Sequence, residues 1–138
     1  MTLAGRNRSA PRLMTGSHLD PVANGGNFDG AAGVIAGLVA SKGLQHLGLQ
    51  PHCDVTTVAI RAEESVWFQV SYVGSRSAFG MLPAGALEAR RVDTGRTLAE
   101  HMAACGASVE AVRRGDASLR MPGLSKPLWS CISSNPHN

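Results

Sequence analysis

A helix-forming segment between two strand-forming segments limits the possible folds of this chain more than any other feature. Residues 12–18 and 55–60 have the composition of short strands, and the second is rich in β-branched side chains. Between them, apolar residues recur at the three- and four-residue spacing of a helix face, at Ala31, Val34, Ile35, Leu38, Val39 and Leu44. Glycines in this helix suggest close packing on a sheet. The order predicts a βαβ unit, and hence an α/β fold with a partial, mostly parallel sheet.

The segments around this unit have weaker signals. Residues 1–11 are polar and have no periodicity, so we expect a frayed entry segment. Residues 20–29 are rich in Pro, Asn and Gly, which is typical of a loop. Residues 66–73 could extend a strand or form a loop, and residues 75–81 are rich in Gly and Ser.

Two short helices are predicted further along the chain, over residues 82–90 and 97–105. The second opens with Thr97-Leu-Ala-Glu100, which has the form of a capping box, and ends at Gly106. Residues 108–114 can form one or two more helical turns.

The composition excludes several classes of function. With 138 residues, of which 43% are hydrophobic and 17% charged, the chain is long enough for one globular domain or part of one. A net charge of +3, scattered basic residues and an aromatic content of 4% argue against nucleic-acid binding. The longest apolar run, residues 31–40, is shorter than the roughly 20 residues of a membrane span. The three cysteines are widely spaced and the N-terminus has no secretory apolar segment, so we expect a cytoplasmic location with reduced thiols.

Ionisable side chains follow both predicted strands at the point where each strand ends. His18 and Asp20 come at the end of the first strand, Asp29 precedes the helix, and Glu63 and Glu64 follow the second strand. Ligands of open α/β sheets bind at this edge of the sheet. We therefore expect all five side chains to meet in one crevice.

These residue types suit a pair of divalent metal ions, with zinc as the first candidate and manganese or cobalt as substitutes. Two metal ions about 3.5–4 Å apart need a bridging carboxylate, and a further carboxylate to deprotonate a water. We predict that His18 binds one ion, Asp29 bridges, and Glu64 binds the second. Glu63 would then act as general base, and Asp20 would orient the imidazole of His18.

Three motifs resemble those of the zinc-dependent hydantoinase/carbamoylase amidases, in the M20 metallopeptidase-like group. They are the HxD of residues 18–20, the NGGxxDG of residues 24–30 and the Glu63-Glu64 pair, and the similarity continues to about Ser118. The family includes N-carbamoyl-L-amino-acid hydrolases, β-ureidopropionases and allantoate amidohydrolases. The resemblance implies a fragment of a three-layer αβα metallohydrolase domain, and hydrolysis of a carbamoyl or amide C–N bond in a small N-carbamoyl or ureido substrate.

The resemblance also implies parts that this chain lacks. Family members are longer and homodimeric, with a dimerisation domain and two further histidine ligands. We therefore expect residues 1–118 to form a partial catalytic domain, residues 119–138 to form an irregular tail, and the chain alone to be inactive. Residues 127–134 match the family motif AFxELHIEQ translated one nucleotide late, so we hypothesise a frameshift near Lys126. Sequencing the encoding DNA tests this.

Two other functions stay open. The chain could be a non-catalytic remnant or pseudogene product, retained at most for contact with a partner. It could also be a fragment of a metallo-aminopeptidase or amino-acid deacylase, although the NGGxxDG spacing favours the carbamoylases. Arg76 could contact a substrate carboxylate, but an exposed loop arginine is the simpler interpretation. We expect no metal role for His46, His52, His101 or His137.

Overall fold

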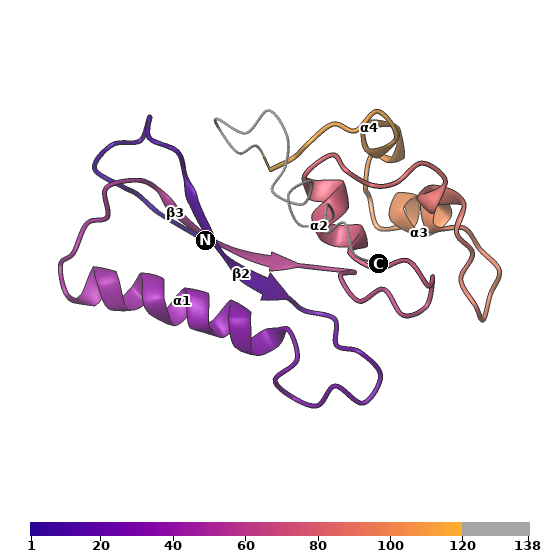
Figure 1. The fold of residues 1–138 in the computed structure, drawn as a ribbon, viewed down its shortest axis with the longest axis horizontal. Helices are drawn as coiled ribbons and strands as arrows, with labels where there is room; N and C mark the ends of the chain where they lie inside the picture. Colours follow the sequence, from indigo (N-terminus) through magenta and orange to yellow (C-terminus); the bar gives the residue numbers. More distant parts are fainter. Residues whose placement is uncertain (120–138) are drawn as a thin grey trace, which may run out of the picture.

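The computed structural model describes residues 1–119. The strands are β1 (Thr2–Leu3), β2 (Leu13–His18) and β3 (Val55–Ile60), and the helices are α1 (Ala31–His46), α2 (Val73–Ala78), the 3₁₀ helix η1 (Ala86–Glu88), α3 (Leu98–Ala104) and α4 (Val109–Arg113). Helix α1 runs along the sheet, whereas α2, α3 and α4 gather beyond the carboxyl ends of β2 and β3 (Figure 1). The predicted tail lies outside the described residues, apart from Leu119.

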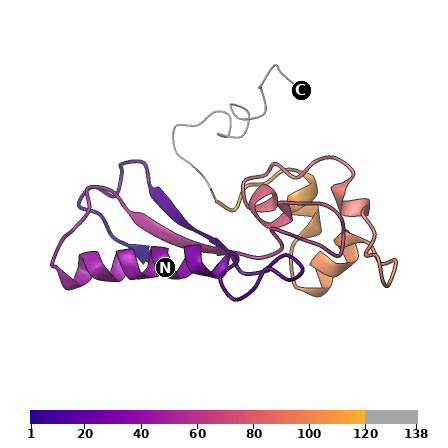
Figure 2. The same ribbon diagram turned by 60° about the horizontal axis from the view of Figure 1, so that its bottom comes forward.

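The sheet has the strand order β1-β3-β2. Strands β2 and β3 are parallel, in register from Leu13 opposite Val55 to His18 opposite Ile60. Helix α1 connects them and covers one face of the sheet (Figure 2). The predicted βαβ unit and the α/β class are therefore confirmed, and the described residues supply a sheet with one helical layer. None of the helices within residues 1–119 combines the length and the apolar character needed to cross a membrane.

Small residues bring α1 close to the strands. A Cβ atom at Gly33 would lie 2.6 Å from Cβ of Ser17, and one at Gly37 would lie 2.9 Å from Cγ2 of Thr57. Ser41 is 1% exposed, and its Oγ lies 3.1 Å from Oγ1 of Thr57. Two members of the predicted apolar face are instead exposed, namely Ile35 and Val39. The glycines, more than the apolar pattern, therefore determine which side of α1 packs against the sheet.

The prediction that residues 1–11 are frayed is wrong. Strand β1 pairs with β3 in antiparallel orientation, and the Met1 ammonium donates to the carbonyl of Thr57. The N–H of Gly5 donates to Oδ1 of Asp54 at 2.9 Å, and the Arg8 guanidinium lies 3.3 Å from Oδ2 of the same carboxylate. Side-chain periodicity gave no sign of this segment because backbone groups and one buried carboxylate hold it.

Of the helices predicted after β3, those that begin with a capping residue in the sequence are confirmed. The capping box of α3 is formed, since Oγ1 of Thr97 accepts from the N–H of Glu100 and the Glu100 carboxylate accepts from the N–H of Thr97. Helix α4 also lies within its predicted range. The predicted helix over residues 82–90 is wrong, because Gly85 has a φ of +85° and only η1 forms after it. Residues 66–72 form turns rather than a strand, and α2 was not indicated by the Gly/Ser-rich composition.

Candidate metal centre

His18 is the last residue of β2, and its ring orientation is fixed from the loop that follows. Its Nδ1 lies 2.9 Å from the backbone carbonyl oxygen of Asp20. A carbonyl oxygen only accepts, so Nδ1–H is the donor, and in the neutral ring Nε2 then carries the lone pair. A neutral imidazole with a free Nε2, held by a hydrogen bond at the other nitrogen, is the form that binds a metal ion.

Two carboxylates face this nitrogen. Nε2 of His18 lies 3.8 Å from Oδ1 of Asp29 and 3.6 Å from Oε1 of Glu64. One ligand atom from each of the three side chains lies within 4.8 Å of the others. Zinc bonds of about 2.0–2.1 Å in tetrahedral geometry place neighbouring ligand atoms roughly 3.4 Å apart. The three groups are therefore compatible with one divalent ion, and the second ion expected from the sequence stays a prediction.

Glycines of the NGGNFDG loop make room for these ligands. Oδ2 of Asp29 accepts from the N–H of Val22 at 2.8 Å, and a Cβ atom at Gly25 would lie 2.7 Å from this oxygen. Gly30 has a φ of +67°, and its Cβ would lie 2.5 Å from Nδ1 of His18. By contrast, a Cβ at Gly26 would have no neighbour within 4 Å. The loop is thus more than a turn, because two of its glycines clear the space that the ligand side chains occupy.

Asp20 contacts His18 through its backbone carbonyl oxygen, and its carboxylate instead bonds to backbone N–H groups. Oδ1 accepts from the N–H of Glu63 at 3.0 Å, and Oδ2 accepts from those of Glu64 and Ser65 at 3.0 and 3.2 Å. Partial burial raises the pKa of Asp20, but the N–H groups of Glu63, Ser65 and Glu64 together outweigh burial and leave this pKa below its usual value. Asp20 therefore orients the imidazole through its backbone carbonyl and uses its carboxylate elsewhere.

Glu63 lies beside the three-ligand group without being part of it. Its Oε2 accepts from the N–H of Ser75 in the first turn of α2 at 2.9 Å. This bond occupies one oxygen of the carboxylate and leaves Oε1 able to accept from a water molecule, as a general base must. The contact could not be predicted, because no pattern in the sequence indicated α2.

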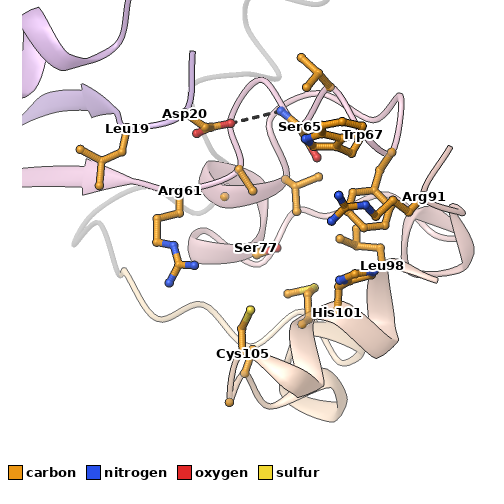
Figure 3. A pocket seen from close by; sticks show the side chains of 18 of the residues that line it. Leu19, Asp20, Arg61, Ser65, Trp67, Ser77, Arg91, Leu98, His101 and Cys105 are labelled. Atoms are coloured by element: carbon orange, nitrogen blue, oxygen red, sulfur yellow. Dashed lines mark hydrogen bonds between the residues drawn. The ribbon is translucent and has the colours of Figure 1, made fainter. Parts of the chain in front are cut away.

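A cavity of about 810 Å³ adjoins the turn that carries Glu63 and Glu64 (Figure 3). Leu19, Asp20, Arg61, Ser65, Trp67 and Leu98 are among its lining residues. Three buried polar atoms on its wall have no hydrogen-bond partner within residues 1–119, namely Oγ of Ser65, Oγ of Ser77 and Nε2 of His101. Sequence patterns gave no indication of this cavity, because its wall comes from four separate parts of the chain.

Arg76 lies in helix α2 and is half-buried, so it is not the exposed loop arginine of the simpler interpretation. Its guanidinium donates to the carbonyl oxygen of Ser71 and stacks over the ring of Tyr72. His101 packs edge-on against Phe68, with ring centroids 5.3 Å apart.

Comparison with known sequences identifies the family of this chain. The sequence model of peptidase family M28 matches residues 1–92. The chain belongs to this family. The M28 chain is 38% identical over 122 residues to the N-carbamoyl-L-amino acid amidohydrolase of Geobacillus stearothermophilus, which covers 88% of the chain and 29% of that relative. It is 36% identical over 86 residues to allantoate deiminase 1 of Glycine max, covering 61% of the chain and 18% of the relative.

Solved structures give the same assignment. A hydantoinase/carbamoylase family amidase from Burkholderia vietnamiensis is 33% identical with a TM-score of 0.65, over 85% of this M28 chain and 27% of that protein. One from Burkholderia ambifaria is 32% identical with a TM-score of 0.66. The resemblance to the hydantoinase/carbamoylase amidases is confirmed, and the M28 chain spans less than a third of the length of these relatives.

Proposed function

We propose that this chain carries part of the metal centre of an amidohydrolase that cleaves a carbamoyl or amide C–N bond in an N-carbamoyl amino acid or related ureido compound. The convergence of His18, Asp29 and Glu64 at the carboxyl ends of β2 and β3 carries the proposal. The names of the relatives given above indicate substrates of this class. We further propose that the 138-residue chain alone does not turn over substrate.

The residues present fit a divalent ion, with zinc first and manganese or cobalt as substitutes. Two carboxylates close to one imidazole repel each other, and a cation between them removes that repulsion. When bound, the metal supplies polarisation of the scissile carbonyl and acidification of a water molecule. A dinuclear centre needs ligands in addition to the three described here, so residues 1–119 provide for one ion.

The remaining steps belong to side chains of this chain. Glu63 accepts a proton from the attacking water and returns it to the leaving nitrogen, while the N–H of Ser75 holds its Oε2. The carbonyl oxygen of Asp20 keeps the proton of His18 on Nδ1, so that Nε2 stays available. Glu64 and Asp29 hold the ion in place.

A chimaera tests the proposal. Residues 1–119 replace the matching segment of the Geobacillus stearothermophilus amidohydrolase, and ammonia release from N-carbamoyl-L-amino acids is measured with zinc. We expect turnover by the chimaera, loss of turnover but not of metal content in its Glu63→Gln variant, and none by the 138-residue chain. A folded, metal-loaded chimaera without turnover contradicts the proposed function. Zinc-dependent ammonia release by the chain itself contradicts its proposed inactivity.

A further inference from the structure

The turn that carries Glu63 and Glu64 has an unfavourable backbone. Ala62 and Ser65, on either side of the pair, have φ values of +58° and +47°. Residues with a Cβ atom seldom adopt this left-handed conformation, because Cβ approaches a carbonyl oxygen. Gln69 and Tyr72, later in the same loop, also have positive φ values. Such a conformation persists only where neighbouring groups hold it.

The Asp20 carboxylate holds this turn from the loop after β2, in addition to backbone bonds from Tyr72 and Gly74 to the carbonyls of Glu63 and Ala62. It accepts hydrogen bonds from three consecutive backbone N–H groups, and both of its oxygens are used. Figure 3 shows the bond to Ser65. Successive N–H groups that point to one anion form a concave site for negative charge. The carboxylate belongs to the loop after β2, so it ties the end of β2 to the turn after β3.

Asp20 therefore reaches two of the candidate ligands through two different groups. Its carbonyl oxygen fixes the imidazole of His18, and its carboxylate fixes the peptide planes around Glu64. With those planes fixed, Oε1 of Glu64 lies 3.6 Å from Nε2 of His18. A substitution of the Asp20 side chain removes the second link and leaves the first in place.

We propose that Asp20 is a positioning residue whose carboxylate directs Glu64 into the metal centre by holding the backbone of residues 62–65, and that it does not act on His18 through this side chain. The inference rests on the proposed metal centre. Asparagine cannot fully replace Asp20, because its amide NH2 is a donor and would face at least one of the three backbone N–H groups. Glutamate has both acceptors but extends further by one methylene group.

A double-mutant cycle on the full chain tests the proposal, with cobalt(II) as the probe metal. Asp20→Asn and Glu64→Gln should each weaken cobalt binding by about 10–100-fold. The double variant should bind no more weakly than either single variant, because both changes remove the same ligand. The cobalt absorption spectra of the two single variants should also agree. Effects that multiply, or an Asp20→Asn spectrum like that of the unchanged chain, would overturn the proposal.

Asp54→Asn is the matched control. Asp54 is also a buried carboxylate that accepts a backbone N–H, but it lies before β3 rather than after it. We expect its substitution to leave cobalt affinity unchanged. If Asp20→Asn folds poorly, adding Ala62→Gly should recover part of the cobalt affinity, because glycine adopts a positive φ without a steric penalty. No recovery in a variant that folds would count against the proposal.

A metal-free measurement separates this inference from the proposed function. In the Asp20→Asn chain without metal, the amide protons of residues 63–65 should exchange faster with solvent, while the Nδ1 proton of His18 keeps its chemical shift. If the unchanged chain binds no cobalt, the proposed metal centre fails, and amide exchange alone then decides the role of Asp20. Unchanged exchange at all three amides would refute it.

Discussion

Two candidate ligands depend on neighbours that have no side chain. The imidazole of His18 lies where a methyl group on Gly30 would be, and the carboxylate of Asp29 lies where one on Gly25 would be. Because the ring is also held by the carbonyl of Asp20, it cannot turn aside without losing that bond. The position of each ligand therefore depends on the missing Cβ atom of a neighbouring glycine as much as on hydrogen bonds.

Gly30→Ala should weaken zinc binding by about 10–100-fold or more, the range for loss of groups that orient a ligand. The added methyl group would displace His18, because a Cβ atom at position 30 would lie 2.5 Å from its Nδ1 and 2.5 Å from its backbone carbonyl oxygen. Gly26→Ala is the control, because Gly26 has a similar φ of +75° but a Cβ atom there would have no neighbour within 4 Å. Titration calorimetry measures both. Equal losses in the two variants would show that backbone strain, and not the contact with His18, is responsible.

Residue type and strand position were enough to predict that His18, Asp29 and Glu64 lie close together, as the structure shows. They lie at or next to the ends of regular elements, and parallel strands bring such ends together. The contacts of Asp20 and Glu63 could not be chosen in this way. They depend on the path of residues 61–75, where positive φ values at non-glycine residues leave no compositional signal.

At the scale of elements, α1 and the two parallel strands form the base of the centre. Helix α1 meets the sheet through Gly33, Gly37 and Ser41, and the loop before it carries Asp29. A displacement of α1 would therefore shift Asp29 relative to His18.

Two glycine substitutions in α1 separate packing from helix propensity. Gly43→Ala should raise the free energy of unfolding by about 0.5–1 kcal/mol, since a Cβ atom there would have no neighbour within 4 Å. Gly37→Ala gains the same propensity, but its methyl group would press on Thr57, and overpacking costs roughly 1–3 kcal/mol. We therefore expect Gly37→Ala to lower stability. Urea denaturation measures both, and a stabilising Gly37→Ala would contradict the close helix–sheet contact.

The attachment of the N-terminal segment should depend on pH. The N–H of Gly5 lowers the pKa of Asp54, burial raises it, and the nearby charge of Arg8 lowers it further, so it lies below the ordinary value of 3.8. The folded chain thus holds this proton less tightly than the unfolded chain. The stabilisation is complete above the ordinary pKa and is lost as the pH falls through the lowered pKa.

Thermal denaturation along a pH series tests this point. Asp54→Asn should lower the melting temperature at neutral pH and reduce its decrease with acidification. Asp93, whose pKa is lowered by the Arg91 guanidinium, keeps part of the pH dependence in the variant. An unchanged pH dependence would contradict the role of Asp54.

Elements with local signals could be predicted, and elements that depend on distant backbone partners could not. Strands β2 and β3, helix α1 and the capped helix α3 have residues that specify them within their own segments. Strand β1 forms because β3 offers an unpaired edge, and η1 is short because of the conformation at Gly85. Neither fact can be read from periodicity.

At the scale of the whole molecule, the three candidate ligands come from three separate segments, which meet only when the sheet and its loops have formed. Metal binding and folding are then linked, because a ligand that binds only the folded chain stabilises it. The outer side of α1 leaves Ile35 and Val39 exposed, and the chain covers 29% of its relative from Geobacillus stearothermophilus. The chain therefore corresponds to less than a third of that relative.

Equilibrium dialysis against zinc, with metal content measured per chain, is the sharpest test of the proposed metal centre. We predict a single ion per chain, lost in each of the variants His18→Ala, Asp29→Ala and Glu64→Ala, while Gly26→Ala retains it. Circular dichroism establishes that each variant is folded. An unchanged chain that retains no zinc, or variants that retain as much as the unchanged chain, would contradict the proposed centre.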